Sequence, residues 1–368
     1  MNYRELSTPA LVIDLGILER NLDRMAAYCR QHGIHLRPHI KTHKTPEVAR
    51  MQLERGALGL TVAKVGEAEV MAEAGFGAGP DEILVAYPIY GADKLRRLVT
   101  LAEARRVLIS LDDEATAEGL SLAASRGNVK FGVLVEFDAG LHRCGLEPGP
   151  ACVALARKIE RLPGLSFRGL MTYFGNVWGT EEERKNEIEH VAALVERALE
   201  AFSEARMPVE IVSGGSTPSH RLSHLVPGLT EIRPGTYVYN DLNTYYQGVC
   251  GFGDCAARVV ATVVSTAVPG RAMIDAGSKT LSSDAVGSGP KSGHGYVVEA
   301  PDAKLLKLNE EHGHLDITNS AHHLHVGEVV TVIPNHVCTC VNMHDEVFLM
   351  RDEQIVGCWR VAARGKVR

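Results

Sequence analysis

Four side chains that carry a positive charge or an imidazole ring alternate along residues 37–44, and they are Arg37, His39, Lys41 and His43. In an extended segment every second side chain lies on the same face, so the four groups would face one way. Burying such a face is costly without an anionic partner, and a phosphorylated cofactor with a carbonyl group would supply one. Lysine forms a Schiff base with a carbonyl when nearby positive charge keeps its amine partly neutral. A solvated basic strand end is the alternative interpretation.

Two later stretches combine small residues with hydroxyl groups. Residues 213–219 read Ser-Gly-Gly-Ser-Thr-Pro-Ser, and residues 233–237 read Arg-Pro-Gly-Thr-Tyr. Small residues let backbone N–H groups approach an anion, and hydroxyl groups add further donors. Pyridoxal phosphate, a phosphorylated aldehyde, would use both stretches together with Lys41. The candidate contacts are Ser213, Gly215, Ser216, Thr217, Arg233, Gly235, Thr236 and Tyr237.

Two more candidates follow the expected fifth and sixth strands of a barrel. Arg143 could reach the ring of the cofactor, although a salt bridge with Asp138 is an alternative. Tyr173 could contact the same ring or could simply pack in the core.

A possible metal site lies far along the chain, where His336 and Cys338 are two residues apart. Imidazole and thiolate are a good pair of ligands for zinc, and two protein ligands leave positions open for water or substrate. A half-buried histidine and cysteine without a metal are the alternative. The histidines within residues 312–314 and 322–325 are expected in loops.

The elements that would position these residues alternate between short apolar strands and helices. Strands are expected at 37–44, 59–63, 82–86, 106–111, 129–137, 166–174, 209–213 and 229–233, with helices between nearly all of them. Eight such units predict a (β/α)8 TIM-type barrel, with the working groups at the carboxyl ends of the strands. An open doubly wound sheet is the alternative, but its glycine-rich dinucleotide fingerprint is missing.

From about residue 256 the pattern changes to apolar runs separated by turn residues. Strands are expected at 259–264, 271–275, 296–298, 328–333, 346–350 and 355–361. We therefore expect a barrel over residues 15–245 and a mainly β domain over residues 246–368, joined by residues 1–14.

Composition narrows the class of protein. The net charge is −6 and no long basic run occurs, so nucleic acid is not an expected partner. No apolar run reaches the length of a membrane span, and residues 1–5 lack a signal-peptide pattern. The eight cysteines have no framework of paired spacings, which favours a reducing cytoplasm.

With these motifs, the chain resembles the fold-type III pyridoxal phosphate enzymes that include alanine racemase. More closely it resembles the branch that holds D-threonine aldolases and D-serine dehydratases. The matching motifs lie at residues 8–14, 37–44, 232–241, 275–279 and 334–338 and together span nearly the whole chain.

The resemblance implies roles for these residues. It implies that Lys41 is the Schiff-base lysine, that the loops at 216–217 and 235–236 contact the phosphate, and that Arg143 lies near the phenolic oxygen of the cofactor. It also implies a divalent metal (Zn, Mn or Mg) on His336 and Cys338, and a homodimer. D-Threonine aldolases often carry His-x-Asp at this place, whereas His-x-Cys is similar to D-serine dehydratases.

The expected activity is a lyase reaction on a β-hydroxy D-amino acid. We favour a D-threonine aldolase type, which yields glycine and an aldehyde. The base that takes the hydroxyl proton would be metal-bound hydroxide, His39 or His43. The alternative is a dehydratase of the D-serine or 3-hydroxy-D-aspartate type, in which Lys41 takes the Cα proton and a 2-oxo acid and ammonia result. A racemase is disfavoured because no second acid–base tyrosine can be identified. A non-catalytic cofactor-binding protein and a cofactor-free barrel aldolase are the alternatives from other classes.

Overall fold

The computed structural model describes residues 1–286 and 292–368, which form two compact units. The β unit comprises Met1–Asp23, Thr42–Glu47 and Thr236–Gly365. The barrel unit comprises Arg24–Lys41, Val48–Gly235 and Lys366–Arg368. The chain passes from one unit to the other several times, and two of these crossings fall between Lys41 and Thr42 and between Gly235 and Thr236.

The barrel unit contains an eight-stranded parallel sheet in the order β2-β9-β8-β7-β6-β5-β4-β3. Its strands are β2 (His35–Leu36), β3 (Gly59–Val62), β4 (Glu82–Val85), β5 (Val107–Leu111), β6 (Phe131–Glu136), β7 (Leu165–Met171), β8 (Ile211–Gly214) and β9 (Glu231–Ile232). The ends of the sheet meet where a parallel bridge joins His39 to Thr61, and the Thr61 N–H donates to the Pro38 carbonyl at 2.9 Å. The predicted closed barrel is therefore confirmed.

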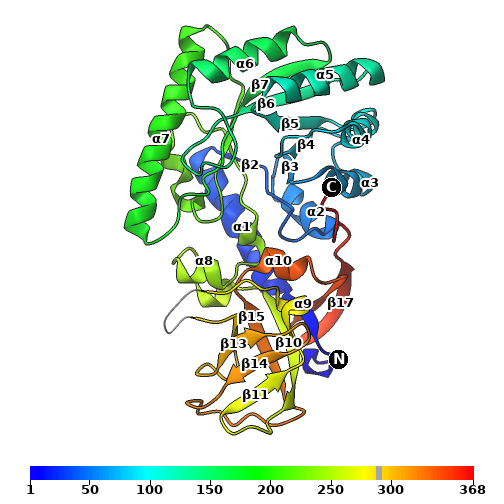
Figure 1. Cartoon of the computed structure of the whole chain (residues 1–368), viewed down its shortest axis with the longest axis vertical. Helices are drawn as coiled ribbons and strands as arrows, with labels where there is room; N and C mark the ends of the chain where they lie inside the picture. Colours follow the sequence, from blue (N-terminus) through cyan, green and yellow to red (C-terminus); the bar gives the residue numbers. More distant parts are fainter. Residues whose placement is uncertain (287–291) are drawn as a thin grey trace. The chain divides into compact units, whose positions relative to one another are not determined.

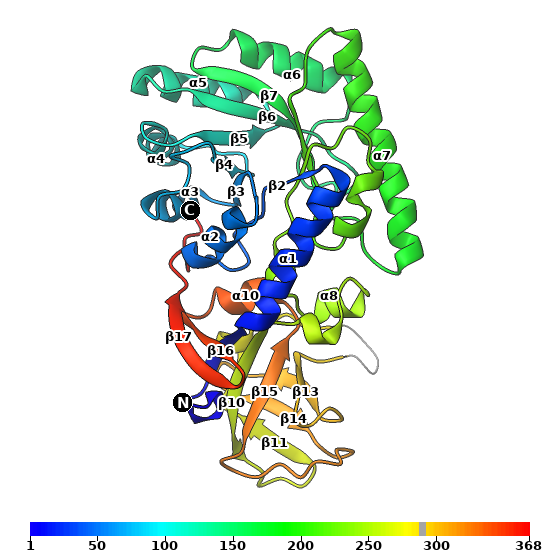
Figure 2. The same cartoon turned by 180° about the vertical axis from the view of Figure 1, so that it is seen from behind.

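Helices cover the outside of these strands (Figures 1 and 2). They are α3 (Val65–Glu73), α4 (Ala92–Ala102), α5 (Glu114–Gly127), α6 (Pro150–Arg161) and α7 (Glu181–Glu204). Helix α1 (Leu15–His32) and helix α2 (Pro46–Glu54) each contain residues of both units. The connection before the last strand is a short 3-10 helix, η2 (His220–Leu225).

The interior of the barrel is charged at its centre. The Nε of Arg37, whose side chain is 1% exposed, lies 2.9 Å from both carboxylate oxygens of Glu231. The Arg37 guanidinium also donates to the Glu82 carbonyl at 3.1 Å. A buried arginine is tolerated only with such partners, so this pair explains how the barrel accommodates the first basic residue of the motif at 37–44.

The β unit is built on a nine-stranded sheet in the order β13-β14-β11-β10-β1-β16-β17, with β15 joining β10 to β12. Its strands are β1 (Ala10–Asp14), β10 (Ala257–Ser265), β11 (Arg271–Ile274), β12 (Gly295–Val297), β13 (Lys304–Leu308), β14 (Gly313–Asp316), β15 (Val329–Pro334), β16 (Glu346–Arg351) and β17 (Gln354–Arg360). Its helices are η1 (Tyr3–Glu5), η3 (Thr236–Val238), α8 (Leu242–Tyr246), η4 (Phe252–Asp254), α9 (Ser278–Leu281) and α10 (Val337–Val341). The predicted mainly β character is confirmed.

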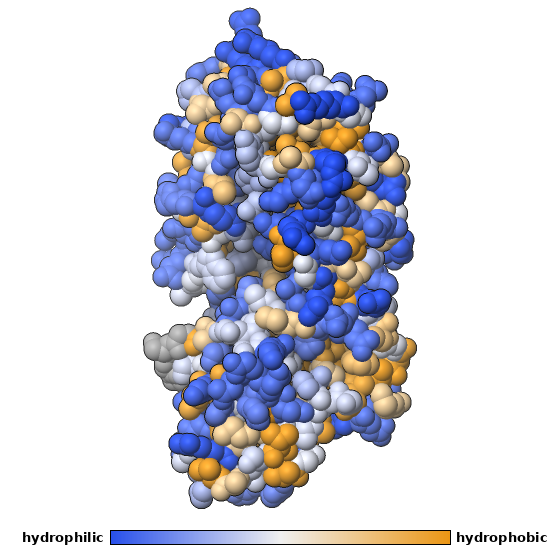
Figure 3. Space-filling view, turned by 45° about the vertical axis from the view of Figure 1, so that its right-hand side comes forward, coloured by the Kyte–Doolittle hydropathy of each residue, from blue (hydrophilic) through white to orange (hydrophobic). Residues whose placement is uncertain are grey.

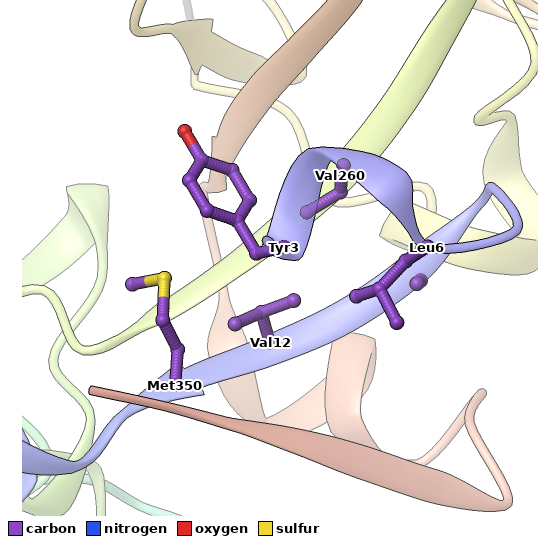
Figure 4. Packing of buried hydrophobic residues seen from close by; sticks show 6 residues of the cluster. Tyr3, Leu6, Val12, Val260 and Met350 are labelled. Carbon is purple, nitrogen blue, oxygen red and sulfur yellow. The ribbon is translucent and has the colours of Figure 1, made fainter. Parts of the chain in front are cut away.

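The N-terminal segment belongs to the core of the β unit. Strand β1 pairs with β10 on one side and β16 on the other. Figure 4 shows the buried Tyr3, Leu6, Val12, Val260 and Met350 packed around this junction. Burying several large apolar side chains, each worth about 1.5–3 kcal/mol, anchors the start of the chain here.

Two local expectations were wrong. Residues 40–43 form a turn, so the extended pattern of residues 37–44 stops at His39. His314 lies in strand β14 and not in a loop, and its Nε2 lies 2.6 Å from Asn309 Oδ1.

One face of the molecule is polar over much of its area. Figure 3 shows hydrophilic side chains spread over the face in view, with hydrophobic groups between them. Among the described residues, no helix is long and apolar enough to cross a membrane.

Candidate active site

Lys41 lies in the turn that follows β2, at the carboxyl end of the barrel. The Lys41 N–H donates to His39 Nδ1 at 3.4 Å, which supports the turn. Its ammonium nitrogen lies 5.7 Å from the centre of the Tyr173 ring. The carboxyl ends of barrel strands carry the working groups of such folds, so Lys41 is placed as a working group would be.

The ring of Tyr173, which lies near Lys41, also contacts a second cation. The guanidinium of Arg143 lies 4.8 Å from the centre of the Tyr173 ring. Asp138 was considered as a salt-bridge partner of Arg143. Its carboxylate instead lies 2.6 Å from Nδ1 of His142. Lys41 and Arg143 therefore gather around one aromatic ring.

The loop after β8 is compact and buried, and Gly215 has a φ of 76° that favours glycine. The Ser216 N–H donates to Ser219 Oγ at 2.9 Å, which closes a tight turn. The imidazole of His220 lies 2.7 Å from the Thr217 carbonyl, and burial lowers the pKa of His220 to about 4. His220 is therefore neutral and donates from Nδ1, which fixes the loop.

Arg233 follows β9 and lies inside the barrel. Its guanidinium donates to Ser213 Oγ and, at 2.6 Å, to the Thr172 carbonyl. The Ser213 hydroxyl in turn donates to Glu231 at 2.6 Å. Burial lowers the pKa of Arg233 to about 10, although Glu231 opposes this shift. Arg233 thus remains a cation at neutral pH and is held by bonds to neighbouring strands.

The remaining predicted phosphate contacts divide between the units. Gly235 is the last residue of its barrel segment, whereas Thr236 and Tyr237 belong to the β unit and form η3. His43, proposed as a base, also belongs to the β unit, is fully buried and has its Nδ1 3.1 Å from the Thr45 carbonyl. His39 belongs to the barrel unit with Lys41.

Sequence reasoning missed Glu136, a buried carboxyl group at the end of β6. It is 4% exposed and lies opposite Met171 in the register with β7. Burial raises the pKa of Glu136 to about 7, and the charges of Arg233 and Arg143 oppose this shift. A charged residue at an inward position of an apolar strand was the available signal.

Cys338 lies in the β unit among hydroxyl groups. The Thr42 hydroxyl lies 3.1 Å from the Cys338 sulfur, and the Thr236 hydroxyl lies 3.7 Å from it. Thr42 follows Lys41 in the sequence, and Thr236 follows Gly235. The two hydroxyl groups next to the sulfur are therefore sequence neighbours of two predicted cofactor-binding residues.

His336 immediately precedes α10. The hydrogen bond with the Cys338 side chain raises the pKa of His336 to about 9, against the effect of burial. The Nδ1 of His336 also lies 3.0 Å from the Asp284 carboxylate. The Val337 N–H donates to Asp241 at 3.0 Å, which secures the backbone between the two candidate ligands.

The residues present fit both groups that the sequence implies. A lysine amine, two arginine cations and a serine-rich loop at the same end of one barrel suit a phosphorylated aldehyde. His336 and Cys338 provide a nitrogen and a sulfur donor in hydrogen-bond contact, which suits zinc. Within the described parts of the chain, no group of three or more His, Cys, Asp or Glu could hold a metal ion.

This arrangement defines a class of barrel with a lysine after the first strand and small-residue loops with hydroxyl groups after the last two strands. The family model "Alanine racemase, N-terminal domain" matches residues 13–243, and "Putative serine dehydratase domain" matches residues 256–350.

The comparisons with individual proteins agree. The chain is 32% identical to a D-threonine aldolase of Arthrobacter sp., over 98% of this chain and 93% of that protein. It is 33% identical to a D-threo-3-hydroxyaspartate dehydratase of Delftia sp. (strain HT23), over 90% of this chain and 91% of that protein. The solved D-threonine aldolase from Filomicrobium marinum is 31% identical, with a TM-score of 0.91 over 100% of this chain and 98% of that chain. The chain belongs to the fold-type III pyridoxal phosphate enzymes, in the branch of D-threonine aldolases and D-serine dehydratases.

Proposed function

We propose that the protein is a lyase that uses pyridoxal phosphate and a divalent metal to cleave β-hydroxy D-amino acids in the manner of a D-threonine aldolase. The product pair would be glycine and an aldehyde. Its relatives support a lyase, since they include both aldolases and dehydratases. The full-length similarity to a D-threonine aldolase structure supports the aldolase type.

The observation that carries this proposal is the contact between Thr42 and Cys338. The Thr42 hydroxyl lies 3.1 Å from the candidate metal ligand, and the next residue back along the chain is Lys41. A protein that merely stored a cofactor would have no use for a Lewis acid. The metal pair therefore favours a substrate whose β-hydroxyl needs a metal partner.

When bound, the cofactor would withdraw electrons from a bond at Cα, and the metal would act as a Lewis acid toward the β-hydroxyl. Lys41 would hold the cofactor and yield its place to the substrate amine. Arg143 and Arg233 would orient the ring, and the loop around Ser216 would bind the phosphate. A base near the β-hydroxyl, for which His39 is the candidate in the barrel unit, would accept its proton as the Cα–Cβ bond breaks.

The second candidate is a dehydratase that acts on D-serine or 3-hydroxy-D-aspartate. The His-x-Cys pair at 336–338 favours it, because a thiolate ligand resembles the D-serine dehydratase pattern. In this reaction Lys41 would take the Cα proton and hydroxide would leave from Cβ. An enamine would then hydrolyse to a 2-oxo acid and ammonia. The same side chains serve both reactions, and the bond aligned with the ring decides between them.

A product assay with D-threonine tests the proposal. The protein is loaded with pyridoxal phosphate and with zinc or manganese, and the products are separated. Acetaldehyde and glycine support the aldolase, whereas 2-oxobutanoate and ammonia support the dehydratase. A protein that binds no pyridoxal phosphate, or whose visible absorption band is the same in Lys41→Ala, would refute both.

We also propose a homodimer, as the family resemblance implies. Light scattering of the loaded protein would give twice the chain mass if this is correct, and a single chain mass if it is not.

A further inference from the structure

Asp284 forms a hydrogen bond with the candidate metal ligand His336. Its Oδ2 lies 3.0 Å from His336 Nδ1, and both residues belong to the β unit. Asp284 lies 52 residues before His336 in the sequence, so only the fold brings the two side chains together.

Asp284 is held in place through both its carboxylate and its backbone. The Thr339 hydroxyl donates to Oδ2 at 2.5 Å, and the Asn335 side chain donates to the Asp284 carbonyl at 3.0 Å. The Asp284 N–H donates to Ser282 Oγ at 3.2 Å. Asn335, His336 and Thr339 lie within five consecutive residues, so one short segment carries both the metal ligand and the groups that hold its partner.

A carboxylate next to one imidazole nitrogen decides which nitrogen carries the proton. Carboxylate oxygens accept hydrogen bonds, so the proton of a neutral His336 resides on Nδ1. The lone pair is then on Nε2, which becomes the nitrogen that can bind a metal. The negative charge of the carboxylate also makes the imidazole a better electron-pair donor to a metal. Carboxylate partners of this kind commonly orient metal-binding histidines.

Building on the proposed metal-dependent function, we propose that Asp284 is a positioning residue that fixes the His336 tautomer and so prepares Nε2 for the metal. Asp284 would act through His336 and would not bind the metal itself. Its Oδ2 already has two partners, His336 and Thr339. No third His, Cys, Asp or Glu joins His336 and Cys338 as a possible metal-binding group anywhere in the described chain.

The test is a titration of cobalt(II) into the metal-depleted, cofactor-loaded protein, followed by absorption. Cobalt(II) reports on its ligands, because a bound thiolate gives a charge-transfer band and the d–d bands depend on coordination number. The variants are Asp284→Ala, which removes the acceptor, and Asp284→Asn, which keeps an oxygen that can accept from Nδ1. Asp302→Asn is the matched control, because Asp302 is an exposed carboxylate of the same unit.

We expect Asp284→Ala to bind cobalt about 10- to 100-fold more weakly than the wild type, while both the thiolate band and the d–d bands of the loaded form are unchanged. Asp284→Asn should lose less affinity, and Asp302→Asn should bind as the wild type does. Partial recovery in Asp284→Asn distinguishes positioning from a general loss of structure.

Two results would overturn the inference. One is an unchanged cobalt affinity in both variants. The other is a change in the d–d bands of Asp284→Ala at saturation, which would make Asp284 a metal ligand. If the wild type itself shows no thiolate band, the proposed metal function fails. That result differs from the one that overturns the inference alone. In that case the wild type binds cobalt with a thiolate band, and both Asp284 variants bind cobalt as tightly as the wild type does.

Discussion

The hydroxyl oxygen of Thr42 lies 3.1 Å from the sulfur of Cys338, although the two residues are 296 positions apart in the sequence. Thr42 is fully buried and is the residue that follows Lys41. The candidate metal ligand therefore contacts the chain one peptide bond away from the candidate cofactor lysine.

Replacing Thr42 by valine should weaken metal binding. Valine keeps the shape of threonine but cannot donate to the Cys338 sulfur, which carries a negative charge when it binds a metal. A hydrogen bond to a charged group contributes about 1.5–3 kcal/mol, so zinc affinity should fall about tenfold or more. Calorimetric titration of zinc into Thr42→Val measures this loss. Thr42→Ser keeps the hydroxyl and should bind nearly as the wild type does, and equal losses in the two variants would contradict the role of the hydroxyl.

Replacing Cys338 by aspartate should change the preferred metal. Thiolate favours zinc, whereas carboxylate suits manganese and magnesium. The ratio of zinc affinity to manganese affinity should therefore fall in Cys338→Asp, as competition titrations would show. Cys340→Ser is a suitable control, because Cys340 is buried with its sulfur 3.3 Å from the Thr280 carbonyl. An unchanged metal preference in Cys338→Asp would remove Cys338 from the metal site.

Breaking the ion pair inside the barrel should destabilise the fold. Glu231→Gln leaves the Nε of Arg37 with a neutral partner, and the Glu82 carboxylate, 3.7 Å from the guanidinium, remains as the charged partner. Loss of one member of a buried pair costs about 3–5 kcal/mol, and the remaining Glu82 contact places the expected loss at the lower end of this range. Urea unfolding of the cofactor-free protein measures the free energy of unfolding. Glu181→Gln removes an exposed pair with Lys185 and should leave the free energy of unfolding nearly unchanged, because solvent screens such a pair. A Glu231→Gln variant as stable as Glu181→Gln would show that the barrel does not depend on this charge pair.

Glu136 should make stability depend on pH near neutrality. Burial raises its pKa from 4.5 to about 7, so the folded protein binds this proton more tightly than the unfolded chain does. The contribution of Glu136 to the free energy of unfolding is therefore full below about pH 4.5 and falls as pH rises to about 7, by about 3 kcal/mol in total. Denaturant unfolding of cofactor-free protein across this range should show the decline, and Glu136→Gln should flatten it. Parallel pH profiles in the two proteins would contradict the raised pKa.

Much of the fold could be predicted because its signals are local. Short apolar strands alternate with amphipathic helices, and each strand–helix unit can be recognised within about 30 residues. Strands β13 and β14 were not predicted, because Lys304, Lys307 and His314 interrupt their apolar pattern. Strand β14 pairs with β11 and β13 pairs with β14, and the sequence pattern does not show these pairings.

The site could be predicted less completely. Lys41 was predicted from the alternation of charged and imidazole groups within the expected strand 37–44, and Arg143 and the serine-rich loop were predicted because each follows an expected strand. The turn at residues 40–43 was not predicted, because the alternation of side chains typical of a strand was assumed to continue past the end of β2. Asp284 and Thr42 were missed as partners of the metal pair, since only tertiary folding brings them to His336 and Cys338.

Cleavage of the Cα–Cβ bond is tested most directly by the fate of a deuterium atom on Cα of D-threonine. The loaded enzyme is mixed with Cα-deuterated D-threonine, and the products of the first turnovers are analysed by mass spectrometry. A retro-aldol reaction leaves the Cα–deuterium bond intact, so we predict glycine that contains one deuterium, together with acetaldehyde. Formation of 2-oxobutanoate with the Cα deuterium lost would contradict the aldolase and establish that the Cα–H bond is the one that breaks.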